Sequence, residues 1–189
     1  MLYLIGGASR AGKSLLARRL LAEHGVPGFP LDAIMMAAQR LPEHGFAVQS
    51  GDSAYQRATM LWPFTSELIF TAAAQMQDYA FEGDYLLPRL VAVFQKKYPA
   101  LPTRAVFLGY AQADPALKLE AIREHVSTND WTRRLDANAL QDVVQRQIDF
   151  SRRLRAECSL WGLPYVEAPA CNHAAAMDRA LATLVQQWG

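Results

Sequence analysis

Cysteine is scarce in this sequence, and its histidines do not cluster. The two cysteines are Cys158 and Cys171, and the four histidines are His24, His44, His125 and His173. No C-x-x-C, H-x-x-x-H or H-E-x-x-H spacing occurs, which argues against the common zinc sites and against a disulfide framework. We therefore expect free thiols, as is usual in a reducing cytoplasm, and surface or capping roles for the histidines.

An excess of charge of either sign is also lacking, as is any long hydrophobic run. The net charge is +1, so we expect neither nucleic acid nor an anionic membrane surface as a partner. A membrane helix needs about 20 apolar residues, which no segment supplies, and the short apolar start is unlike a signal peptide. With 51% hydrophobic and 20% charged residues, the 189-residue chain is expected to form one cytoplasmic globular domain spanning 1–189.

One motif stands out near the start of the chain. Residues Gly7-Ala8-Ser9-Arg10-Ala11-Gly12-Lys13-Ser14 match the phosphate-binding pattern G-x-x-x-x-G-K-[ST]. The glycines permit a tight turn whose backbone N–H groups face phosphate oxygens, and the following helix adds its positive end. We expect the whole stretch, with the next residue Leu15, to bind ATP. Lys13 would reach the β- and γ-phosphates and Ser14 would hold Mg²⁺.

The surroundings of the motif support this interpretation. A buried strand is predicted before it, over the apolar residues 1–5, and a helix after it, where leucines recur at helical spacing. Strand and helix patterns then alternate, which favours a parallel sheet with crossover helices. Further strands are predicted near 29–32, 78–84, 104–110 and 163–167. The long segment 33–77 is predicted to be mostly helical, with a kink or restart at Pro63, and to bind the substrate.

Acidic residues follow the second and third predicted strands, where ligands of parallel sheets gather. Asp32 is a candidate base for a substrate hydroxyl or a water-mediated Mg²⁺ ligand, although it would also cap the following helix well. Glu82 is a candidate for holding Mg²⁺ through water or, with Gly83, for binding the substrate; alternatively it is an acid on a solvated turn. Asp84 suits a turn or a cap.

Arginines provide the remaining candidates. Arg133 and Arg134 lie in a polar segment, 126–136, where a lid closing over a γ-phosphate would need positive charge. Arg123 is a second candidate for that role, and ordinary surface positions are the alternative. Within 33–77, Arg40 or Arg57 is a candidate for binding an acidic group of the substrate, again with a surface position as the alternative.

The phosphate loop, the acids after the strands and the late basic segment together resemble the P-loop kinases of the nucleoside monophosphate, shikimate and gluconate kinase branch. The stretch Phe81 to Pro88 is also similar to kinases of the 2-phosphoglycerate kinase type. The resemblance implies a three-layer α/β/α fold, a five-stranded parallel sheet in the order 2-3-1-4-5, a mobile lid, and the use of ATP and Mg²⁺. The adenylate kinase lid signature, the shikimate kinase glycine turn and the guanine-reading N-K-x-D motif are absent, so the acceptor is not identified.

The leading hypothesis is an ATP-dependent kinase that acts on a small metabolite or nucleotide. Lys13, Asp32 and Arg133 or Arg134 would carry the transfer. A regulatory P-loop protein that binds nucleotide without transfer is one alternative, and a P-loop ATPase that passes phosphate to water is another.

Overall fold

The computed structural model describes residues 1–41, 53–75, 78–124, 131–169 and 172–185. Its centre is one sheet of five parallel strands in the order β2-β3-β1-β4-β5. The strands are β1 (Leu2–Gly7), β2 (Gly28–Pro30), β3 (Tyr79–Gly83), β4 (Thr103–Gly109) and β5 (Tyr165–Glu167). The expected sheet and its strand order are therefore confirmed.

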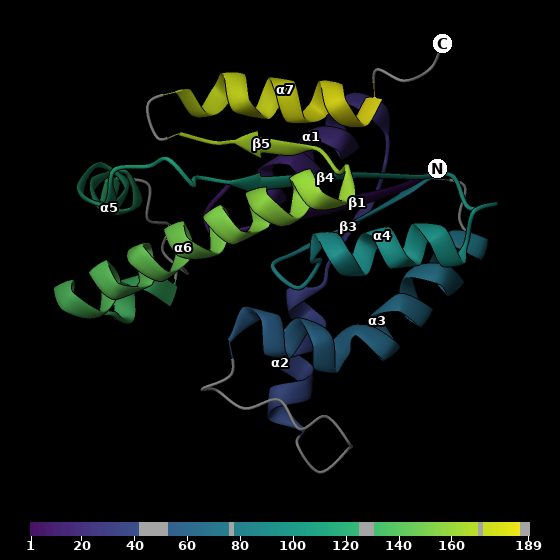
Figure 1. Ribbon diagram of the computed structural model, residues 1–189, viewed down its shortest axis with the longest axis horizontal. Coiled ribbons are helices and arrows are strands. Elements are labelled where there is room, and N and C mark those ends of the chain that lie inside the picture. Colours follow the sequence, from purple (N-terminus) through teal and green to yellow (C-terminus); the bar gives the residue numbers. More distant parts are fainter. Residues whose placement is uncertain (42–52, 76–77, 125–130, 170–171, 186–189) are drawn as a thin grey trace.

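Seven α-helices and a 3-10 helix accompany the strands in the described part of the chain. They are α1 (Lys13–His24), α2 (Asp32–Arg40), α3 (Ala54–Gln75), α4 (Pro88–Lys97), α5 (Pro115–Glu124), η2 (Trp131–Arg134), α6 (Ala137–Trp161) and α7 (His173–Val185). Helices α1 and α7 cover one face of the sheet, and α3, α4 and much of α6 cover the other (Figure 1).

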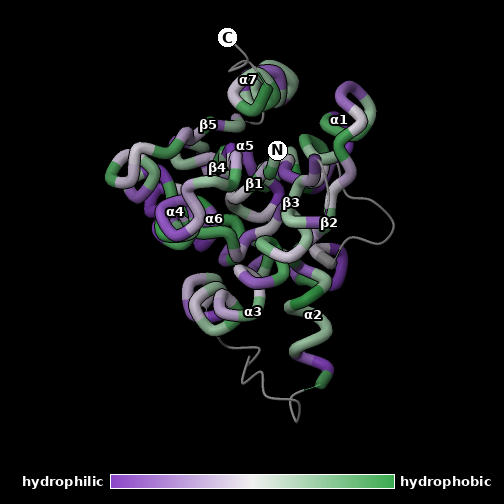
Figure 2. The backbone as a smooth tube through the Cα atoms, turned by 90° about the vertical axis from the view of Figure 1, so that its right-hand side faces the viewer, coloured by the Kyte–Doolittle hydropathy of each residue, from purple (hydrophilic) through white to green (hydrophobic). Residues whose placement is uncertain are grey.

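Side chains of the central strands alternate between the two faces, as the pleat of a strand requires. In β1, Tyr3 and Ile5 join the core beneath α1 and α7, whereas Leu2 and Leu4 join the core beneath α3 and α4. The helices are apolar on one side only, so hydrophilic and hydrophobic colours alternate along α7 in Figure 2. Burial on both faces fixes the register of the strands.

Several helix ends follow sequence signals. Pro88 occupies the first turn of α4, and the Asp114 carboxylate accepts hydrogen bonds from the first N–H groups of α5, at Ala116 and Leu117. At Pro63 the sequence left a kink and a restart open. Helix α3 does not restart there but runs unbroken from Ala54 to Gln75, and it changes direction along its length (Figure 1).

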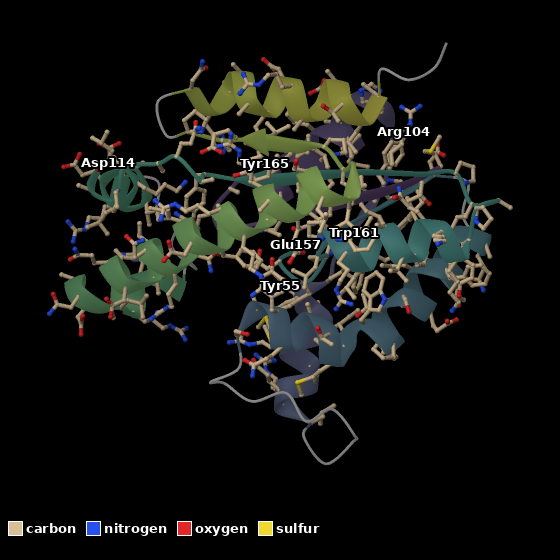
Figure 3. The ribbon with its side chains drawn as sticks, in the orientation of Figure 1. Tyr55, Arg104, Asp114, Glu157, Trp161 and Tyr165 are labelled. Carbon is tan, nitrogen blue, oxygen red and sulfur yellow. The ribbon has the colours of Figure 1, made fainter. Side chains whose placement is uncertain are left out.

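The N-terminal turn of α3 is held against α6. The Tyr55 ring meets the Phe150 ring edge-on, with ring centres 5.5 Å apart, and the Arg153 guanidinium lies 3.4 Å from the Tyr55 ring centre. Figure 3 shows Tyr55 next to Glu157 of α6. These contacts fix the height of α3 above the sheet and thereby the position of Arg57, two residues further on.

Some predicted features lie outside the described residues: segment 42–52 of the expected substrate region, segment 126–130 of the expected lid, and Cys171, His44 and His125. Cys158 is a free, buried thiol, as expected. In the part of the chain that the structure describes, no helix is both long and apolar enough to cross a membrane.

Candidate active site

The phosphate loop joins β1 to α1 in a conformation that few residues other than glycine adopt. Positive φ angles occur at Gly7 (142°), Arg10 (63°) and Gly12 (104°). Gly12 caps the N-terminus of α1 and, as a glycine, has no side chain to accept a hydrogen bond from the first N–H groups of that helix. These N–H groups are therefore available to an anion, as the motif predicts.

Close packing around the loop explains both motif glycines. A Cβ atom at Gly7 would strike the backbone of Leu108, and one at Gly12 would lie 2.8 Å from Nε2 of His173 and 2.9 Å from Sδ of Met177. The loop is also tied from outside, because its Ser9 N–H donates to the Gln147 amide oxygen over 2.9 Å. These contacts thus hold the phosphate loop in shape.

Lys13 is buried, with 6% of its surface exposed, at the centre of the site. Its Nζ donates to the carbonyl of Ala8 over 2.9 Å and forms an ion pair with the Asp84 carboxylate. Burial alone would lower the pKa of Lys13, but the charge and hydrogen bond of Asp84, with smaller effects of Asp32 and Glu82, outweigh it and raise the pKa. Lys13 is therefore a stable cation.

Ser14 is linked to the third strand. Its hydroxyl donates to Oε1 of Glu82 over 2.8 Å. Glu82 is not an acid on a solvated turn, since it pairs in register with Ile5 inside the sheet and is only 6% exposed. Its strand position turns it toward α1, on the same face as Ala80. Because Glu82 accepts the hydrogen bond from this hydroxyl, the lone pairs of Ser14 Oγ remain available to a metal ion.

Asp32 is the first residue of α2, and the capping position belongs to Leu31. No side-chain capping bond forms, so the capping alternative for Asp32 is wrong. Its Oδ1 is buried and has no hydrogen-bond partner in the described structure. Burial, followed by the negative charge of Asp84, raises the pKa of Asp32 to about 6, although Lys13 opposes the shift. A buried carboxylate of this kind accepts a proton readily near neutral pH.

These groups line one cavity of about 620 Å³ at the carboxyl ends of the strands. Its lining residues are Ser9, Arg10, Gly12, Lys13, Ser14, Leu15, Arg18, Asp32, Glu82, Asp84, Lys118, Ala121, Ile122 and His173. The structure therefore brings most of the predicted donor-site residues together with Asp32 and Glu82. Gly83 packs beside them, because a Cβ there would lie 3.4 Å from Oδ1 of Asp32.

The candidate arginines lie at different places. Arg57 donates a hydrogen bond to the hydroxyl of Tyr85, whose pKa is raised to about 12 by burial and by the charges of Asp32 and Asp84. Arg57 is thus near the acids. Arg40 is exposed at the far end of α2, beside a separate cavity of about 440 Å³.

The two lid candidates do not line the main cavity. Arg133 and Arg134 are both exposed in η2. Arg133 borders a further cavity of about 440 Å³ together with Arg123, at the junction of α5 and α6. Of the three arginines considered for the lid, Arg123 and Arg133 thus share a cavity, and none of the three lines the cavity of the phosphate loop.

Several residues of the site were missed from the sequence. Asp84 was expected at a turn or cap, yet it pairs with Lys13. Lys118, with an exposed fraction of 5%, was not singled out, and His173 was expected at a surface or capping position, yet both line the cavity. A lysine inside an otherwise ordinary helix carries no local signal. For Asp84, its position two residues after the third-strand glutamate was the available clue.

The side chains of the site can be compared with what a metal ion requires. In the described residues, no three His, Cys, Asp or Glu side chains form a group that could hold a metal ion. Mg²⁺ in phosphoryl-transfer sites is held instead by one or two protein oxygens together with phosphates and water. Ser14 and the Glu82 behind it fit that requirement, and the orphaned Oδ1 of Asp32 fits an additional polar partner.

No family model and no curated protein matches this sequence. Solved structures match over nearly its whole length. A shikimate kinase from Bacteroides thetaiotaomicron is 13% identical, with a TM-score of 0.57, and the match covers 98% of this chain and 97% of that chain. A sugar kinase from a Janibacter species is 14% identical, with a TM-score of 0.60 and coverages of 98% and 94%. A gluconokinase from Sinorhizobium meliloti is 17% identical, with a TM-score of 0.57 and coverages of 97% and 91%. At these identities the likeness is one of fold, and this chain has the fold of the P-loop kinases.

Proposed function

We propose that the protein is an ATP-dependent kinase that transfers the γ-phosphoryl group to a hydroxyl or phosphate of a small metabolite or nucleotide. The observation that carries the proposal is the Asp32 carboxylate. It lines the same cavity as Lys13 and Ser14, has a buried oxygen without a hydrogen-bond partner in the described structure, and has a pKa raised to about 6 by burial and by Asp84. A carboxylate with these properties is suited to accept the proton of an acceptor hydroxyl.

The donor half of the site consists of the phosphate loop, Lys13 and Ser14. The loop N–H groups and the Lys13 ammonium bind the phosphates and neutralise charge that develops on them. Ser14, oriented by Glu82, holds Mg²⁺, which when bound draws negative charge from the phosphate oxygens. Phosphoryl transfer needs mainly such positioning and charge neutralisation, so few side chains suffice.

The acceptor half lies between Asp32 and α3. Arg57, which hydrogen-bonds Tyr85 close to both acids, is well situated to bind an anionic group of the acceptor. We therefore assign the acceptor to the class of small hydroxylated metabolites that carry a carboxylate or phosphate. Arg40, which faces a different cavity, is assigned no role in binding it.

We assign charge neutralisation during transfer to Arg133 or Arg134. Both follow α5, one wall of the cavity, and both are exposed and thus able to move toward a bound nucleotide. Arginine is the residue best suited to bind several phosphate oxygens at once. This role requires a movement of η2 toward the phosphate loop.

The proposal is tested by incubating the protein with magnesium-ATP and a panel of hydroxylated acids, sugar acids, sugar phosphates and nucleoside monophosphates. Phosphorylated products would be identified by mass spectrometry. We expect product with at least one acceptor, and loss of that product in Lys13→Met. ATP binding with no product across the panel would favour the regulatory alternative. Steady phosphate release that no acceptor stimulates would favour the ATPase alternative.

A further inference from the structure

Lys118 is a buried cation for which neither the motif nor the proposed chemistry accounts. It lies in the first turn and a half of α5, the helix whose capping residue Asp114 is labelled at the left of Figure 3. Only 5% of its surface is exposed, yet it lines the cavity that contains the phosphate loop. Lysine is almost never buried so fully without a partner of opposite charge.

The contacts of Lys118 leave its charge uncompensated. Its Nζ donates to the carbonyl of Arg10 over 3.2 Å and lies 3.9 Å from the ring centre of Tyr110. An ammonium has three donors, and the described structure gives this one a single oxygen acceptor. No described carboxylate forms an ion pair with Lys118. Apart from the Arg10 carbonyl and the face of the Tyr110 ring, the described residues therefore offer no partner to this ammonium, which lines the cavity.

The charged and titratable groups around Lys118 make an anion more favourable still. Arg10 approaches it from the phosphate loop, Tyr110 from the end of β4, and His173 of α7 lines the same cavity. Burial first, and the positive charge of Arg10 second, lower the pKa of Lys118 to about 8. Both effects would be reversed by a bound anion, because it would supply the missing opposite charge.

The position of Lys118 also ties α5 to the phosphate loop. The carbonyl that it binds belongs to Arg10, and the neighbouring carbonyl, that of Ser9, accepts a hydrogen bond of 2.8 Å from the Tyr110 hydroxyl. The ammonium is therefore within hydrogen-bond distance of the loop itself, on the α5 side. Lys13, which contacts Ala8 and Asp84, lies on the sheet side.

We infer that Lys118 is a second phosphate-binding residue, which holds a phosphate group of the nucleotide from α5 while Lys13 holds the nucleotide from the loop. The inference rests on the proposed function in so far as the ligand is a nucleoside triphosphate. It goes beyond the motif, which assigns phosphate binding to the loop and to Lys13 alone.

Binding of magnesium-ATP, measured by calorimetry without an acceptor, tests this role. We expect Lys118→Met to weaken ATP binding about 10- to 100-fold, the range for loss of a charge-assisted hydrogen bond, and Lys118→Arg to retain most of the affinity. Lys96→Met is the matched control, because Lys96 is exposed on α4 and does not line the cavity. The ATP affinity of this variant should equal that of the wild type. The affinity for adenosine, measured by displacement of a fluorescent ATP derivative, should be the same in the wild type and in Lys118→Met.

A second measurement follows protons rather than affinity. Since burial and Arg10 lower the pKa of Lys118 to about 8 and a bound anion would raise it again, ATP binding near pH 8 should be accompanied by proton uptake. Calorimetry in two buffers of different ionisation enthalpy measures this uptake, which should disappear in Lys118→Met.

Five outcomes decide between these possibilities. Unchanged ATP affinity in Lys118→Met, or no proton uptake by the wild type, would overturn the inference. Equal losses for adenosine and ATP would also overturn it, by assigning Lys118 to the nucleoside. No phosphorylated product with any acceptor would overturn the kinase proposal yet leave this inference standing, since it is measured by ATP binding alone. Failure of the wild type to bind ATP would overturn both.

Discussion

The ammonium of Lys13 forms a buried ion pair with the carboxylate of Asp84, one residue past the end of β3. This pair supplies a counter-charge for the motif lysine. It also places a second negative charge near Asp32, which contributes to the raised pKa of that residue. Asp84 therefore affects both the stability of the loop and the proton affinity of the candidate base.

Asp84→Asn should lower the stability of the protein and shift the pH dependence of turnover. Removing one partner of a largely buried pair leaves Lys13 less compensated, and we expect a loss of about 2 kcal/mol in the free energy of unfolding. The negative charge that raises the pKa of Asp32 would also be gone, so the acidic limb of the pH–rate profile should move to lower pH. Urea unfolding and turnover between pH 4 and 8 measure the two effects.

Asp142→Asn is the matched control for that variant, because Asp142 is exposed on α6 and does not line the cavity. It should change neither stability nor the pH profile. An acidic limb at the same pH in Asp84→Asn and in the wild type would contradict the coupling of Asp84 to Asp32.

Asp32→Asn should abolish phosphoryl transfer and raise stability above pH 6. The pKa of Asp32 is raised to about 6 in the folded state, above its ordinary value of 3.8, so the folded state binds more protons than the unfolded state between these values. The unfavourable burial of the charge therefore develops as the pH rises from 4 to 6 and is complete above 6. Removing the charge should gain about 1–3 kcal/mol at pH 7 and nothing at pH 4.

Thermal unfolding of both proteins at pH 4 and pH 7 measures this difference, and product formation measures the loss of transfer. Full turnover in Asp32→Asn would remove this residue from the base role, whatever its effect on stability.

Gly12→Ala should prevent nucleotide binding, whereas Gly28→Ala should not. At Gly12 the backbone has φ of 104°, and a methyl group would lie 2.8 Å from the His173 ring. The loop must therefore deform, at a cost of about 1–3 kcal/mol, and its N–H groups lose their alignment. At Gly28, an edge-strand position, the nearest atom would be 3.6 Å away, an ordinary contact. ATP affinity that is equal in the two variants would contradict this account of the loop.

The sequence predicts this fold well because its strongest signals are local. The loop motif, the apolar run before it and the spacing of leucines after it all occur within about 20 residues, and each depends on backbone geometry that the residue types dictate. Asp32 and Glu82 were found by the same logic, since acids at the ends of parallel strands meet at one edge of the sheet.

The rest of the site depends on contacts between distant segments, for which no local pattern exists. Lys118 reaches the Arg10 carbonyl across 108 positions of the chain, and Gln147 binds Ser9 across 138. The choice between Arg40 and Arg57 likewise depends on where α2 and α3 are anchored. From sequence alone a lysine is expected to be exposed to solvent, and Lys118 is an exception because it is buried.

Lys118→Met should stabilise the protein without its nucleotide, although the same change is expected to weaken ATP binding. The pKa of Lys118 is lowered from an ordinary 10.5 to about 8 by burial and by Arg10, so the unfolded state binds more protons between pH 8 and 10.5. The stability of the wild type should therefore rise as the pH increases through this window, and the cost of the buried charge is complete below pH 8. At pH 7 the variant should gain about 2 kcal/mol.

Denaturant unfolding at pH 7 and pH 10 checks this prediction, and the gain should be smaller at pH 10. A variant that is less stable than the wild type at pH 7 would show that Lys118 contributes packing and cation–π contact with Tyr110 that exceed the cost of its burial.

Arg57→Met should weaken acceptor binding selectively, whereas Arg40→Met should have no effect. Arg57 donates to the hydroxyl of Tyr85, which lies near Asp32 and Asp84, and Arg40 borders a different cavity at the far end of α2. Loss of one charge-assisted hydrogen bond to an anionic acceptor predicts a rise in the acceptor KM of about 10- to 100-fold. The KM for ATP should stay the same, because Arg57 does not line the cavity around the phosphate loop. Steady-state kinetics with each substrate varied in turn separates the two constants.

Equal increases in both KM values would mean that Arg57 acts by holding α3 in place rather than by binding the acceptor. An effect confined to Arg40→Met would move the acceptor site to the outer end of α2.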